Sequence, residues 1–218
     1  MKKFLVMVAL AVMTAVTISV EVYAGDGVKS GIMAGFTSSS SNAKHLDASN
    51  IGQYHIGLTV KFPVAFGFAI QPAVLYQTKG TKLSDASVDN FKLNAKVGYV
   101  EVPVQIQWGP DLLAFRPYIF AEPFLGYGLF TKVKNREAGE TVKTRSFSKS
   151  GLARWEYGLG LGAGIELWRF QLSAKYYWNF GSLYSDSGEL SHVGEQVKMA
   201  FKDGRNFNGL TISLAYMF

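Results

Sequence analysis

The stretch QYHIGLTVKF, residues 53–62, decides how the chain is interpreted. Its apolar residues Tyr54, Ile56 and Leu58 alternate with polar or small residues such as His55. Successive side chains of a strand point to opposite faces, so a period of two predicts a strand, whereas a helix would mix the two sets.

Seven further segments repeat this alternation. They are residues 28–37, 67–77, 99–108, 116–128, 154–166, 170–179 and 209–218. Each has one uncharged apolar face, and each is about as long as the ~9–11 residues that a tilted strand needs to cross a bilayer. The body of the chain therefore reads as eight membrane-length strands.

The connections between these strands alternate in length. Residues 63–65, 109–115 and 167–169 form short connections, whereas residues 38–50, 78–98, 131–153 and 180–208 form long polar ones. Short periplasmic turns at one end and long extracellular loops at the other are typical of outer-membrane barrels. We therefore predict an all-β fold, an eight-stranded antiparallel up-and-down transmembrane barrel that occupies residues 25–218.

Alternation alone does not say which face points outward. In RWEYGLGLGAGIE, residues 154–166, the polar face is largely glycine. A water-facing exterior would be rich in Lys and Glu, whereas glycines suit a narrow lumen in which neighbouring large side chains need room. We therefore expect the apolar face to contact lipid, and the barrel to be closed because every backbone group in lipid must be bonded internally.

Both ends of the chain agree with export to the outer membrane of a Gram-negative cell. Two lysines, an apolar run from Phe4 to Val20 and small residues before Ala24 have the layout of a secretory signal, so we expect residues 1–24 to be a cleaved signal peptide. The final Phe218 on the closing strand resembles the recognition signal of the bacterial barrel-assembly machinery.

Composition narrows the classes of function. Apolar residues make up 48% of the 218 residues and charged ones 17%, which argues against disorder. The chain has no cysteine, so it carries no disulfide, thiolate metal site or thiol nucleophile. We expect no cofactor and no metal. The predicted location argues against nucleic acid as a partner of the basic residues.

Residues 68–127 carry a resemblance to a known family. The stretches IQPAVLYQTKG at 70–80, YVEVPV at 99–104 and PYIFAEP at 117–123 look like the PorT-type outer-membrane barrels, which are close in size to the OmpX and OmpA barrels. The family pattern often has Glu where Ala73 stands and Gly where Glu122 stands. The resemblance implies a porin-like outer-membrane barrel; a role in secretion is not carried over.

Charged residues on the polar faces predict a network inside the lumen. An eight-stranded barrel is just wide enough for its own side chains, and an unpaired charge there would be costly. The predicted network consists of Lys61, Glu101, Arg116, Glu122, Arg154, Glu156 and Lys175. We interpret it as a structural plug; the alternative is a narrow channel or transport component.

The long connection at 131–153 is basic, and a solvated loop is its plainest interpretation. The alternative is contact with the phosphates of lipopolysaccharide, because Lys and Arg pair well with phosphate. The residues concerned are Lys132, Lys134, Arg136, Lys143, Arg145 and Lys149.

We therefore predict a small outer-membrane protein with a structural or interaction role through its extracellular loops, which would contact outer-membrane lipid or an unidentified protein partner. The alternative is a channel or an accessory of a secretion apparatus. A lipid A-modifying enzyme is the remote alternative, because no catalytic nucleophile and base are placed on rigid strand ends.

Overall fold

The computed structural model describes residues 27–41, 47–84, 92–112, 114–137, 140–144, 154–180 and 207–218. The signal-peptide prediction lies outside these residues. The strands are β1 (Lys29–Ser41), β2 (Asp47–Pro63), β3 (Phe68–Ser84), β4 (Lys92–Trp108), β5 (Arg116–Glu137), β6 (Glu140–Thr144), β7 (Trp155–Leu167), β8 (Phe170–Asn179) and β9 (Phe207–Met217).

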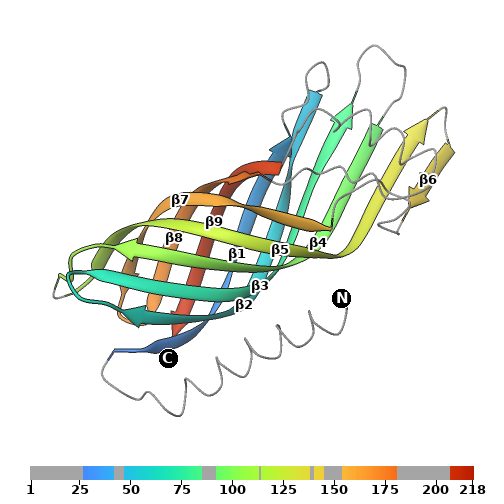
Figure 1. Ribbon diagram of the computed structural model, residues 1–218. Coiled ribbons are helices and arrows are strands. Elements are labelled where there is room, and N and C mark those ends of the chain that lie inside the picture. Colours follow the sequence, from blue (N-terminus) through green and yellow to red (C-terminus); the bar gives the residue numbers. More distant parts are fainter. Residues whose placement is uncertain are drawn as a thin grey trace.

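The strands form a closed antiparallel barrel (Figure 1). The sheet runs β4-β3-β2-β1-β9-β8-β7-β5, and the pairing of β4 with β5 closes the ring. The short β6 pairs only with the far part of β5, beyond the ring. The predicted eight-stranded antiparallel barrel is thus confirmed. No helix among the described residues is both long and apolar enough to span a membrane.

The predicted facing is also confirmed. Ile56, Ile106 and Leu161 point outward and are about half exposed, whereas the intervening His55 and Gln107 are buried. Exposed apolar residues alternate with buried polar residues in this way around the ring. The apolar side chains therefore lie on the outside of the barrel, and the polar side chains lie in its lumen.

The glycines of β7 make room for aromatic rings in the lumen, as predicted. Phe120 lies opposite Gly162 in the β5–β7 register, and Tyr118 lies opposite Gly164. A Cβ atom added to Gly162 would stand 2.6 Å from Cζ of Phe120, far too close for van der Waals contact. A larger residue here would force the aromatic side chain out of its place.

Two groups of outward aromatic side chains mark the two ends of the apolar band. The loop-end girdle, at the end where β6 lies, comprises Tyr54, Tyr76, Tyr127, Phe130 and Trp155. The turn-end girdle comprises Phe170, Tyr216 and Phe218. Aromatic girdles at both interfaces are typical of transmembrane barrels.

Beyond the loop-end girdle, several strands continue further than predicted. We call this part the extension: residues 47–50, 80–84, 92–97 and 131–137 of β2 to β5, together with β6. It lies at the upper right of Figure 1. Much of the connections predicted at 38–50, 78–98 and 131–153 is therefore strand. Those predictions followed an apolar outward face, and they stopped where that face becomes polar.

Candidate functional site

The lumen holds a fully buried lysine between two carboxylates. Nζ of Lys79 on β3 lies 2.6 Å from Oε2 of Glu101 on β4 and 2.9 Å from Oε1 of Glu156 on β7. The side chain of Lys79 is only 1% exposed. Nδ2 of Asn179 donates a further hydrogen bond to Glu156. One ammonium thus ties together β3, β4 and β7.

Three aromatic rings surround the same ammonium. Nζ of Lys79 lies 4.5 Å from the ring centroid of Phe124, 4.8 Å from that of Tyr177 and 5.8 Å from that of Tyr99. Aromatic faces attract a cation at these distances, and more strongly when water is excluded. We call Lys79, Glu101, Glu156 and these rings the Lys79 cluster.

A second ion pair lies nearer the middle of the lumen. Lys175 on β8 pairs with Glu122 on β5, and Nε2 of Gln105 donates a 2.7 Å hydrogen bond to the same carboxylate. The carboxylate of Glu122 is therefore held from two sides in the low-dielectric interior.

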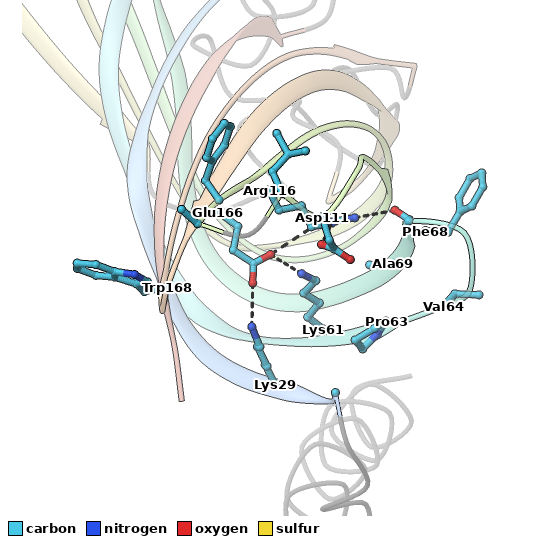
Figure 2. A pocket seen from close by; sticks show the side chains of 15 residues that line it. Lys29, Lys61, Pro63, Val64, Phe68, Ala69, Asp111, Arg116, Glu166 and Trp168 are labelled. Atoms are coloured by element: carbon cyan, nitrogen blue, oxygen red, sulfur yellow. Dashed lines mark hydrogen bonds and ion pairs between the residues drawn. The ribbon is translucent and has the colours of Figure 1, made fainter.

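The third group closes the turn end. The Glu166 carboxylate accepts hydrogen bonds from Lys29, at 3.0 Å, and from Lys61, and Nη1 of Arg116 lies 3.9 Å away. Figure 2 shows these side chains converging at the mouth of a cavity of about 400 Å³. The cations and the carboxylate of this mouth come from β1, β2, β5 and β7.

Arg116 also joins two turns of the turn end. Its Nη2 donates a 2.8 Å hydrogen bond to the carbonyl oxygen of Gly67, which also accepts one from the amide of Gly109. Its Nε lies 3.3 Å from Oδ1 of the exposed Asp111. The guanidinium therefore holds the β2–β3 turn against the start of the β4–β5 turn.

Amide side chains link β3, β4 and β8 above this mouth. Gln107 donates to Oε1 of Gln71 at 2.7 Å, and Gln71 donates to Oε1 of Gln171 at 3.0 Å and to Oγ1 of Thr59 at 3.1 Å. Because β3 and β8 are not neighbours in the ring, the bond between Gln71 and Gln171 crosses the lumen.

These contacts make the lumen a filled interior. The bond from Lys79 to Glu156 spans β3 to β7, and that from Lys61 to Glu166 spans β2 to β7. Bonds between strands that are not neighbours in the ring thus occur at several heights of the described part of the lumen. The arrangement is suited to closing the barrel.

The structure brings six of the seven predicted lumen residues into these groups; they are Lys61, Glu101, Arg116, Glu122, Glu156 and Lys175. Arg154, predicted for the lumen, lies instead on the exposed rim just before β7, where it donates a 3.2 Å hydrogen bond to the Tyr127 hydroxyl. The alternation that places Arg154 inward continues one residue past the wall of the barrel.

Sequence reasoning missed Lys79, the centre of the network. It stands in a stretch predicted as a loop. The signal that could have found it is the inward face of β3, because Gln71, Ala73, Leu75 and Gln77 lead to Lys79 in steps of two.

One pair of lumen residues has the chemistry of a nucleophile and a base. Nε2 of His55 lies 3.0 Å from Oγ of Ser213. Both side chains are buried, and no described group hydrogen-bonds to Nδ1 of His55. A serine hydrolase triad also has an acid that orients the histidine; the described residues show a buried hydrogen bond that joins β2 to β9. The other two histidines of the chain, His45 and His192, lie outside the described residues.

The predicted basic loop is partly wrong in its structure. Lys132, Lys134 and Arg136 lie in β5 and Lys143 lies in β6, so four of the six residues belong to the paired strands of the extension. Arg145 and Lys149 lie outside the described residues. No group of three or more His, Cys, Asp or Glu residues suited to a metal ion occurs in the part of the chain that the structure describes.

Residues 20–185 match the family of outer membrane protein beta-barrel domains. The chain belongs to this family. This membership places the protein in the outer membrane, as predicted. No curated protein matches the chain.

Solved outer-membrane barrels are similar to this barrel at low identity. OprG of Pseudomonas aeruginosa is 12% identical, with 88% of this chain and 94% of that chain covered and a TM-score of 0.46. Ail, the attachment invasion locus protein of Yersinia pestis, is 13% identical, with 87% and 98% covered and a TM-score of 0.45. Neisserial surface protein A is 12% identical, with 88% and 100% covered and a TM-score of 0.40.

Proposed function

We propose that this outer-membrane barrel is a closed scaffold that acts through contacts at its loop end and does not conduct ions or solutes. The observation that carries the proposal is the set of ion pairs across the lumen, above all the bond from Lys79 to Glu156. Outer-membrane barrels turn their longer connections to the cell exterior, so the extension is the part that meets extracellular partners.

A conducting path through this lumen would have to separate buried ion pairs. Removing one partner of such a pair costs about 3–5 kcal/mol, because a buried charge is left uncompensated. The Lys79 cluster and the pair of Lys175 with Glu122 lie in series, so an ion would meet both. A narrow channel is therefore the weaker alternative.

Three finer assignments belong to this proposal. The PorT-type resemblance rests on residues 68–127 and implies an outer-membrane barrel. A role as an accessory of a secretion apparatus would fit the same closed barrel. Phe218, which follows the closing strand β9, is expected to serve recognition by the barrel-assembly machinery.

Conductance in planar lipid bilayers tests the proposal. The refolded mature chain is expected to give no regular open-channel steps, with a general-diffusion porin in the same bilayer as the control for detection. Regular steps from the wild-type chain would overturn the closed-scaffold proposal in favour of the channel.

A further inference from the structure

The register of the extension places cations directly opposite one another on neighbouring strands. Lys96 on β4 is paired with Lys132 on β5, and Lys92 is paired with Arg136. On the other side of β5, Lys134 is paired with Lys143 of β6. Like charges directly opposite each other destabilise a sheet.

These pairs belong to one face of the sheet, because directly paired residues share a face and residues two apart along a strand also share it. We call this the cationic face. Its basic positions are Lys82, Lys92, Lys96, Lys132, Lys134, Arg136 and Lys143, and its one acidic position among the described strands is Asp47, on β2 at the margin.

The cationic face continues the lipid-facing surface of the barrel. The pairing of β3 with β4 keeps one register from Phe68↔Trp108 to Ser84↔Lys92. Trp108 points outward, so the other even-numbered positions of β4, including Lys92 and Lys96, are on the outward face as well.

The opposite face of the extension has no basic residue, and half of its paired positions are apolar. The apolar positions are Ala48, Leu83, Leu93, Ala95, Val97, Val133 and Val142, and the others carry Asn, Thr or Glu. The polarity of the two faces is thus reversed relative to the membrane-spanning part, where the outward face is apolar.

Shifts of one residue in the pairing of β5 with β4 and of β2 with β3 bring the polar positions of all these strands to the same face. In β5, Gly128 pairs with Tyr99 but Phe130 pairs with Gly98, so Leu129 is an extra residue. A bulge of one residue moves all following residues to the other face. In β2, a second shift between Asn50 and His55 has the same effect. If Leu129 were paired and not bulged, Lys132, Lys134 and Arg136 would be on the inward face.

The cationic face begins immediately above the loop-end girdle. On β5, Lys132 is the next outward position after Phe130, about 7 Å further along the strand at ~3.3 Å per residue. Aromatic girdles lie at the membrane–water interface. The lowest cations of the face are therefore at the depth of the lipid headgroups.

From this placement we infer that the cationic face binds the phosphate groups of lipopolysaccharide in the outer leaflet of the outer membrane. Paired Lys and Arg positions match dense phosphate charge, which would relieve the repulsion between them. The inference rests on the proposed function, because it requires the extension to be at the extracellular end.

Lipid is favoured over a soluble polyanion because the cationic face is continuous with the lipid-facing surface of the barrel. The cations stand on the same outward surface, and on the same strands, as the apolar band and the girdle. A molecule that touches both parts needs acyl chains and an anionic headgroup, and basic residues beside a membrane gain affinity from anionic lipid.

The test is a titration of the refolded mature chain in neutral detergent with fluorescent hexa-acylated lipid A. The variant K96Q/K132Q/K134Q removes three charges from the cationic face. Each basic residue near an anionic membrane surface raises the affinity about fivefold, so the loss of three should lower the affinity roughly 100-fold. The control E137Q/E140Q changes two charges on the opposite face, one on β5 and one on β6, and it should bind as the wild type does.

Two further ligands separate the alternatives. Lipid A without phosphates should bind the wild type as weakly as the intact lipid binds the triple variant. Equal binding of both lipids, or an undiminished affinity of the triple variant, would overturn the inference. A sulfated oligosaccharide that binds tightly where lipid A does not would overturn it in favour of a polysaccharide partner.

Folding and lumen closure are checked on the same samples. Heat-dependent gel mobility reports whether each variant is a folded barrel, and conductance reports the lumen. Open-channel steps together with normal lipid A binding would contradict the closed scaffold alone. A barrel that gives no open-channel steps but binds lipid A equally with and without phosphates would contradict the lipid site alone.

Discussion

The membrane-spanning part and the extension are built from the same strands with the same alternation but with opposite polarity. Along β4, residues 101–108 place Val, Ile and Trp outward and Glu and Gln inward, whereas in residues 92–97 the continued register assigns Lys and Asn to the outward positions and Leu, Ala and Val to the inward ones. Alternation therefore makes the strand, and the medium that touches each face decides which residues it carries.

The two regions meet in one layer of the barrel. Outside, the layer is the loop-end girdle; inside, it is the Lys79 cluster. On β3, Tyr76 belongs to the girdle, and Lys79 follows three residues later on the inward face. Below this layer the lumen is held by buried ion pairs, and above it half of the inward positions of the extension are apolar and none is basic.

The largest effect is expected from the buried charge of this layer. Lys79→Met would leave Glu101 and Glu156 buried without their shared cation, at a cost of about 3–5 kcal/mol in the free energy of unfolding. Lys82→Met, three residues along the same strand but on the cationic face, should change it by less than about 0.5 kcal/mol. Urea unfolding of both variants in lipid vesicles measures this contrast; equal effects would contradict the facing of β3.

A new charge on the outward face of β4 should be most costly inside the band. Val104→Arg is expected to cost ~2–4 kcal/mol near the bilayer midplane, because the guanidinium must enter hydrocarbon. Asn94→Arg stands ten residues away on the same face of the same strand, and it should cost only about 1 kcal/mol, from repulsion by the paired Lys82 and Lys134. Because only Val104→Arg places the charge in hydrocarbon, similar yields of inserted barrel would argue against the placement of the band.

The smallest effect on stability is expected from removing the bulge. Deletion of Leu129 should restore an uninterrupted ladder, because Gly128 and Phe130 already pair with the adjacent residues Tyr99 and Gly98. Lys132, Lys134 and Arg136 should keep their partners and their face, and the free energy of unfolding should change by only ~1 kcal/mol. Affinity for lipid A should stay at the wild-type value, and a fall as large as in the triple variant would contradict the assignment of Leu129 as the extra residue.

The barrel could be predicted from the sequence because a strand in lipid must have an apolar face, which makes the period of two easy to recognise. Stretches such as QYHIGLTVKF show the period, and the glycine-rich 154–166 indicates which face is inward. Lumen charges such as Glu101, Glu122 and Lys175 follow from the polar phase of that period.

The extension could not be predicted in the same way. Its outward face is polar, so residues 80–84 and 92–97 look like a loop when an apolar face is the criterion. The bulge at Leu129 changes the phase of β5, which hides the basic residues from any period-two pattern carried up from the membrane. Lys79 was missed because the outward face is already polar at its neighbours, so its stretch was predicted as a loop. Arg154 was assigned to the lumen because the period of two does not indicate where the wall of the barrel ends.

The reversal of polarity along one strand is the central claim, and a nitroxide scan of β4 tests it most directly. The chain has no cysteine, so single cysteines can be introduced at positions 92–108 and spin-labelled in lipid vesicles. The account predicts high accessibility to oxygen and low accessibility to a water-soluble nickel complex at 102, 104 and 106, and the opposite at 92, 94 and 96. Lipid-like accessibility at 92–96, or water-like accessibility at 102–106, would contradict it.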